Sequence, residues 1–88
     1  MTFIFPRIKF VESNGIATQI LHIGKEYQEA YDASFTPDIQ HTAEEVMDCL
    51  HACETALRIL NEKYGINLHK LRRDVERKNF DRGYYDVE

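Results

Sequence analysis

Apolar side chains recur at helical spacing over most of the chain. At about 100° per residue, one group of them falls on a single side of a helix: Ile16, Ile20, Ile23, Tyr27, Ala30 and Tyr31. A second group forms the central stripe of a longer helix: Val46, Leu50, Cys53, Leu57, Leu60 and Tyr64. The spacing therefore predicts two amphipathic helices, over residues 14–34 and 37–64.

Capping signals mark the ends of the longer helix. Thr36 is placed as an N-cap, and Pro37 suits the first helical position. Thr42 and Glu45 form a competing capping box, which leaves the start of the helix open. Gly65 is expected to end the helix, because glycine readily adopts the left-handed conformation that follows many helices.

The remaining segments are shorter. We predict a third helix over residues 67–80, with Leu68, Leu71 and Val75 facing inward. Residues 1–13 carry several apolar side chains without a clear period. We expect either a short strand or an extended arm in this segment.

Composition narrows the class of protein. Eighty-eight residues form one domain, 1–88, and we expect an all-α fold with an antiparallel helical hairpin plus a third helix. The net charge of -4 argues against sequence-independent binding of a nucleic acid polymer. Apolar runs are too short to span a membrane. Two cysteines without an export signal predict a reduced, cytoplasmic protein.

Two pairs of carboxylates are the candidate chemistry. Glu26 and Glu29 are three residues apart in the first helix, as are Glu45 and Asp48 in the second, so each pair shares one side of its helix. The midpoint between the pairs falls at Pro37, close to the expected turn. An antiparallel hairpin would therefore bring all four acids to a similar height.

The position of Glu45 distinguishes this cluster from an ordinary solvated helix face. In projection Glu45 falls between Ala52 and Ala56 on the apolar arc, whereas Glu44 projects with Thr55 toward water. A carboxylate on a buried arc is costly unless it is paired or binds a cation. Ligands that are all oxygen suit Mg²⁺, with Mn²⁺ as an alternative.

The acids and their surroundings resemble the signature of the MazG-like, all-α nucleoside triphosphate pyrophosphohydrolases. The resemblance rests on Glu26-x-x-Glu29, fifteen intervening residues and Glu45-x-x-Asp48. It extends to the flanking sequences GKEYQEA and AEEVMDCL, and it covers about residues 16–82. The chain is most similar to the short, phage-type or Firmicute-type members of the family.

This resemblance implies a Mg²⁺-dependent reaction. A ribo- or deoxyribonucleoside triphosphate would be cleaved between its α and β phosphates, giving the monophosphate and pyrophosphate. The four acids would hold the metal, which polarises the phosphate and lowers the pKa of a bound water. Glu29 or Glu26 would accept a proton from that water, and the sequence leaves open which of them does so.

The end of the third helix supplies candidate substrate contacts. Lys78, Asn79 and Arg82 project onto the same side as the apolar positions of that helix if it continues. Cationic groups there can meet a phosphate, and a similar segment lies near the substrate in proteins that the chain resembles. The alternative is a solvated helix end, where cations also favour the helix dipole.

The width of the apolar face predicts self-association. The longer helix is apolar over an arc of about 240°, far wider than a single core-facing stripe. We expect a symmetric homo-oligomer, either a dimer or a dimer of dimers, that completes the helical bundle. The alternative function is a non-catalytic helical interaction or regulatory module that retains the four acids, and Mg²⁺ binding is the observation that discriminates.

Overall fold

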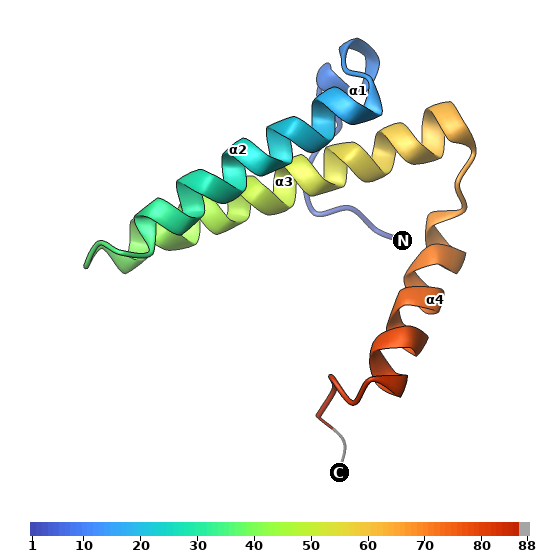
Figure 1. The fold of residues 1–88 in the computed structure, drawn as a ribbon. Coiled ribbons are helices and arrows are strands. Elements are labelled where there is room, and N and C mark those ends of the chain that lie inside the picture. Colours follow the sequence, from blue (N-terminus) through green and yellow to red (C-terminus); the bar gives the residue numbers. More distant parts are fainter. Residues whose placement is uncertain (87–88) are drawn as a thin grey trace.

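A computed structural model describes residues 1–86, and every regular element in that part of the chain is a helix. The elements are α1 (Phe10–Ser13), α2 (Ile16–Ala33), α3 (Ile39–Tyr64) and α4 (Leu68–Asp81). Helices α2 and α3 pack side by side as an antiparallel hairpin (Figure 1). The all-α prediction is confirmed, and the strand considered for residues 1–13 does not form. Among the described residues, no helix has the length and apolar character needed to cross a membrane.

The hairpin turn is closed by polar side chains. Asp38 is the N-cap of α3, because its carboxylate accepts a hydrogen bond from the backbone N–H of His41 at 3.0 Å. The predicted caps are therefore wrong, and α3 begins later than position 37. The hydroxyls of Thr36 and Thr42 instead donate to the carbonyl oxygen of Ala33, at 2.8 and 3.0 Å. Both threonines thus hold the end of α2 rather than the start of α3.

Helix α3 ends where the sequence predicts, and the chain then turns away from the hairpin. Gly65 has a φ of 68°, a left-handed conformation that glycine adopts without steric cost. Beyond it, α4 runs away from α2 and α3 (Figure 1). Of the three apolar positions expected to face inward, Leu68 is buried, Leu71 is half-buried and Val75 is exposed. The third helix therefore does not join a bundle within one chain.

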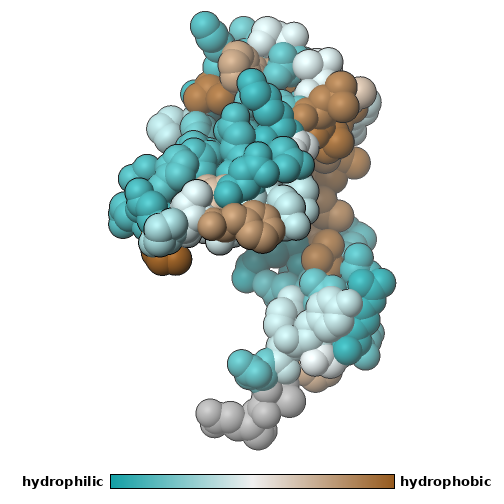
Figure 2. All heavy atoms as spheres, turned by 60° about the vertical axis from the view of Figure 1, so that its left-hand side comes forward, coloured by the Kyte–Doolittle hydropathy of each residue, from teal (hydrophilic) through white to brown (hydrophobic). Residues whose placement is uncertain are grey.

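The core lies along one flank of α3. It consists of small and medium side chains together with three polar ones: Val11, Ala33, Ala52, Ala56, Ile59, Leu68, Gln19, Glu54 and Thr55. The predicted central stripe lies outside this core, since Val46 is 53% exposed and Tyr64 is 59% exposed. Figure 2 shows apolar side chains left open along one side of the molecule. The hairpin thus buries the small residues of α3 and leaves many of its large ones uncovered.

An N-terminal arm, residues 1–9, covers a second face of α3. The carboxylate of Glu54, only 4% exposed, accepts hydrogen bonds from the backbone N–H groups of Ile4 and Phe5 at 2.9 to 3.1 Å. The guanidinium of Arg58 donates to the carbonyl oxygen of Phe5 at 2.8 Å. The expectation that Thr55 faces water is therefore wrong. Its exposed fraction is only 2%.

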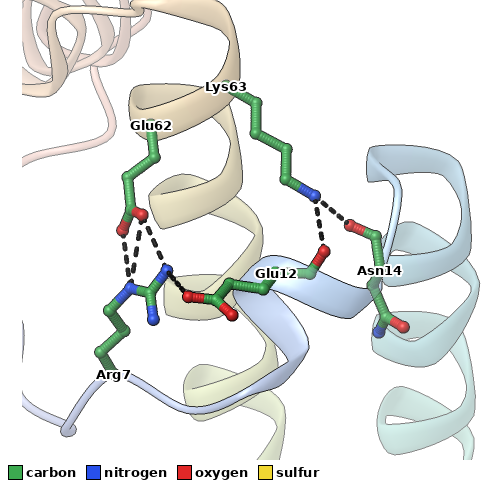
Figure 3. Close-up of polar contacts among 5 residues, drawn as sticks. All are labelled: Arg7, Glu12, Asn14, Glu62 and Lys63. Carbon is green, nitrogen blue, oxygen red and sulfur yellow. Dashed lines mark hydrogen bonds and ion pairs between the residues drawn. The ribbon is translucent and has the colours of Figure 1, made fainter.

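Two further contacts anchor the chain beyond the arm's first residues (Figure 3). Arg7 forms a two-pronged ion pair with Glu62 near the end of α3, at 2.9 and 3.1 Å. The ammonium group of Lys63 donates to the carbonyl oxygens of Glu12 and Asn14, at 3.2 and 3.0 Å. Residues 4–14 are thus tied to α3 at several points even though most of the arm has no regular structure.

Candidate metal centre

Three of the four predicted acids converge between α2 and α3. Glu26 and Glu29 lie one turn apart on α2, and Glu45 faces them from α3. One oxygen from each of the three carboxylates lies within 4.8 Å of the others. The side chains of Glu26 and Glu45 are only 15% and 17% exposed, while Glu29 is exposed. The spacing about the hairpin turn brings these acids to one height, as the sequence predicts.

Among residues 1–86, no lysine or arginine forms an ion pair with these carboxylates, and the imidazole of His41 lies 3.8 Å from the Glu45 carboxylate. Burial raises the pKa of Glu26 above its ordinary value, and the negative charges of Glu29 and Asp48 add to the effect. The imidazole of His22, 3.6 Å from the Glu26 carboxylate, opposes the rise. Oε2 of Glu45 is buried and has no hydrogen-bond partner among the described residues. A hard divalent cation would offset the repulsion at Glu26 and would give the Glu45 oxygen a partner. The available ligand atoms are all carboxylate oxygens, which such cations prefer.

Asp48 occupies a neighbouring position. Its side chain is exposed, and it lies outside the group of three mutually close carboxylates. It lines a cavity together with Glu26, and its negative charge acts on Glu26 through space. Asp48 is therefore adjacent to the cluster, at the side where α2 and α3 open toward the cavity.

The cavity beside the acids has a volume of about 270 Å³. Helices α2 and α3 supply part of its lining, and Ile8 and Phe10 from the N-terminal segment supply the rest. The sequence does not identify either residue as part of a site, and it places His51, which also lines the cavity, on the solvent side of its helix. The apolar residues before position 11 indicate that this segment is partly buried, but they do not indicate which surface it covers.

The three predicted substrate contacts lie elsewhere in the chain. Lys78 and Asn79 belong to α4 and Arg82 is its C-cap, in the part that turns away from the hairpin (Figure 1). Lys78 and Arg82 are exposed, and the guanidinium of Arg82 lies 5.9 Å from the ring centre of Tyr84. Within residues 1–86 none of the three lines the cavity or joins the carboxylate cluster.

The raised pKa of Glu26 makes a prediction for the metal-free protein. Its ionised form opposes folding, and this penalty is fully present above the folded pKa and lost as the pH falls toward the unfolded value of 4.5. At pH 7.5 in EDTA, Glu26→Gln should therefore melt a few degrees higher than the wild type. Thermal unfolding followed by circular dichroism should show the difference shrinking as the pH is lowered to 4.5.

A matched control accompanies this measurement. Glu44→Gln removes an exposed carboxylate of the same helix hairpin and should leave the melting temperature nearly unchanged. A stability gain from Glu26→Gln that grows on acidification would contradict the sign assigned to the pKa shift.

The arrangement can hold a cation and can move a proton. Two carboxylates one helical turn apart, facing a third across a hairpin, offer oxygen ligands from two rigid elements. A carboxylate whose pKa is raised, as that of Glu26 is, is also a better proton acceptor than an ordinary glutamate. Comparison of the chain with models of protein families, with curated proteins and with solved structures finds no match.

Proposed function

We propose that this protein is a Mg²⁺-dependent nucleoside triphosphate pyrophosphohydrolase that converts a triphosphate and water to a monophosphate and pyrophosphate. The carboxylate cluster carries the proposal, because Glu26, Glu29 and Glu45 approach one another from two helices, and no lysine or arginine of residues 1–86 forms an ion pair with them. The resemblance of their spacing to that of MazG-like enzymes supports the same reaction. Mn²⁺ is the alternative metal, since it accepts the same oxygen ligands.

The residues divide the work between holding a cation and moving a proton. Glu26, Glu29 and Glu45 would hold Mg²⁺, with Asp48 next to them at the cavity. The bound metal supplies charge neutralisation for the phosphates and makes a water molecule more acidic. Glu26 or Glu29 would accept the proton from the attacking water.

A screen of the common ribo- and deoxyribonucleoside triphosphates tests this function directly. With Mg²⁺ present, at least one of them should yield pyrophosphate and the monophosphate in equal amounts. Release of single phosphate groups would indicate cleavage at another bond. Absence of turnover with every triphosphate, in both Mg²⁺ and Mn²⁺, would contradict the proposal.

The cations at the end of α4 make a second test of the same reaction. A triphosphate carries about four negative charges, and arginine or lysine must offset those left by the metal. Because α4 turns away from the acids, Lys78 and Arg82 can serve only if a second chain presents them across an interface. We expect Lys78→Ala or Arg82→Ala to reduce turnover at least tenfold, a loss of about 1.4 kcal/mol, without changing metal affinity.

Arg77→Ala is the control for the α4 variants. Arg77 lies on another side of the helix, beside Arg73 and Phe80 on a shallow surface pocket, and its loss should be nearly silent. Equal damage from Arg77→Ala would show that the assigned helix face is wrong. If none of the three variants reduces turnover, the phosphate contacts lie in another part of the protein.

The exposed apolar surface favours a second candidate, a non-catalytic interaction module. Tyr27, Tyr31 and Val46 are all about half exposed on the hairpin, which is unusual for apolar residues that only maintain a fold. A module of this kind has no need of a metal at the three glutamates. Isothermal titration calorimetry with Mg²⁺ therefore separates the two candidates before any substrate is known, because only the hydrolase needs to bind the metal.

A further inference from the structure

The cavity next to Glu26 is built in part by the N-terminal segment. Ile8 and Phe10 line it together with Glu26, Asp48 and His51. The Phe10 ring meets the ring of His22 edge to face, with 6.0 Å between the ring centres. This wall comes from a segment that has little regular structure of its own, so its position depends on what holds the segment in place.

The segment is held on both sides of the wall residues. On the N-terminal side of Ile8 and Phe10, the Glu54 carboxylate accepts hydrogen bonds from the backbone N–H groups of Ile4 and Phe5. After them, Lys63 donates to two backbone carbonyl oxygens at the end of α1 (Figure 3). A buried carboxylate must keep such hydrogen bonds, because leaving it unpaired costs far more than an exposed contact contributes. Glu54 therefore fixes the arm from which Ile8 extends toward the cavity.

The chemistry of the lining suits an uncharged, flat group. Its charged residues are the carboxylates Glu26 and Asp48, and no lysine or arginine of the described chain lines the cavity. A phosphate would be repelled there. The remaining lining is mixed, with apolar side chains beside the polar side chains of Gln19 and Thr55. His22 offers a partly exposed imidazole edge. A volume of about 270 Å³ lies just below the usual range for whole small-molecule ligands, which matches one ring system rather than a complete nucleotide.

We propose that the N-terminal arm selects the substrate: Ile8 and Phe10 form one wall of a subsite for the nucleobase, and Glu54 is the positioning residue that holds this wall against the hairpin. This inference rests on the proposed function, since it assigns the base of the triphosphate to the cavity and its phosphates to the neighbouring acids. The imidazole of His51 on α3 also lines the cavity and stacks on Phe5 with 4.3 Å between ring centres, so this contact joins the arm to the cavity lining.

Steady-state kinetics with the best triphosphate, and equilibrium binding of its monophosphate product, test the subsite. Phe10→Ala should raise KM, and the dissociation constant of the monophosphate, at least tenfold. The affinities for Mg²⁺ and for inorganic tripolyphosphate, which has no base, should stay within about twofold. Ile4→Ala is the matched control, because its side chain is 66% exposed on the same arm while its backbone N–H remains.

Variants of Glu54 test the positioning role. Glu54→Ala should raise KM at least tenfold with kcat little changed, and Glu54→Gln should restore part of the loss because an amide oxygen still accepts the two N–H groups. A fall in kcat and thermal stability with KM unchanged, in both Glu54 variants, would overturn this role. An unaltered KM and monophosphate affinity in Phe10→Ala would overturn the base subsite.

The two proposals fail in different ways. If no triphosphate is hydrolysed but the monophosphate binds and Phe10→Ala weakens that binding, the subsite stands and the hydrolase assignment is wrong. If hydrolysis proceeds and Phe10→Ala affects nucleoside triphosphate and tripolyphosphate alike, the hydrolase assignment stands and the arm does not select the base.

Discussion

Glu45→Gln is expected to abolish Mg²⁺-dependent pyrophosphate release, by at least about a hundredfold, while the helical fold stays intact. Glu45 is the only member of the three-glutamate cluster contributed by α3, and its Oε2 is buried without a partner among residues 1–86. Replacing it by an amide keeps the shape of the side chain and removes one negative charge from the cation site. Pyrophosphate assays and circular dichroism measure the two effects separately.

The same substitution should act in the opposite direction on stability. In metal-free buffer it removes repulsion among close carboxylates, so the melting temperature of Glu45→Gln should be equal to or higher than that of the wild type. Glu44→Gln, one residue earlier and exposed, should be mild in both assays. Full activity in Glu45→Gln would show that the metal is not held at this cluster.

The hairpin and the acid cluster were accessible from sequence because both depend on local regularities. Helical period and the glycine at position 65 define the two long helices, and the equal distances of Glu29 and Glu45 from the turn place them side by side. Asp38 displaced the predicted caps for an equally local reason, since aspartate is a better N-cap than threonine. The start of α3 therefore depends on which of several neighbouring caps is the strongest.

The N-terminal arm could not be placed in this way. It has no period, and its position is determined by contacts with residues about fifty positions away, such as those between Glu54 and the N–H groups of Ile4 and Phe5. A glutamate in the middle of a helix is normally read as solvent-exposed. Here it is buried because it replaces the missing hydrogen-bond partners of an irregular segment. The cavity wall depends on that segment and was therefore hidden as well.

Helix α4 shows a different limit. The helix begins at Leu68, as local signals indicate. Asn67 is its N-cap, because its side-chain oxygen accepts a hydrogen bond from the backbone N–H of Lys70 at 3.0 Å. Its orientation relative to the hairpin does not follow from such local signals. The inward face predicted for Leu71 and Val75 is largely uncovered in the structure. Amphipathic periodicity identifies such a face but not the surface against which it packs.

The uncovered apolar surface leads to the last prediction, that the protein is a homo-oligomer at micromolar concentration. An apolar groove with a volume of about 510 Å³ runs between α2 and α3, and it is lined mainly by Tyr27, Tyr31, Val46, Cys49, Leu50 and Cys53. The buried core of one chain is small, and this groove contains half of the apolar stripe predicted for the longer helix, namely Val46, Leu50 and Cys53. A second copy of the hairpin, placed by two-fold symmetry, would cover both grooves at once.

Val46→Asp tests this interface. Val46 is already 53% exposed in the single chain, so an aspartate there should cost the hairpin little while placing a charge in the middle of the groove. Light scattering should give a multiple of 10.4 kDa for the wild type and about 10 kDa for the variant. Leu21→Asp is the control, because Leu21 is highly exposed on α2 but does not line the groove.

Activity should follow the oligomeric state if the cations of α4 act across the interface. The Val46→Asp variant would then lose turnover because it no longer binds a second subunit. Its three-glutamate cluster remains and should still bind Mg²⁺. Leu21→Asp should keep both the assembly and the turnover. A wild-type protein that is monomeric at micromolar concentration would refute the interface, and it would also remove the means by which Lys78 and Arg82 reach the phosphates.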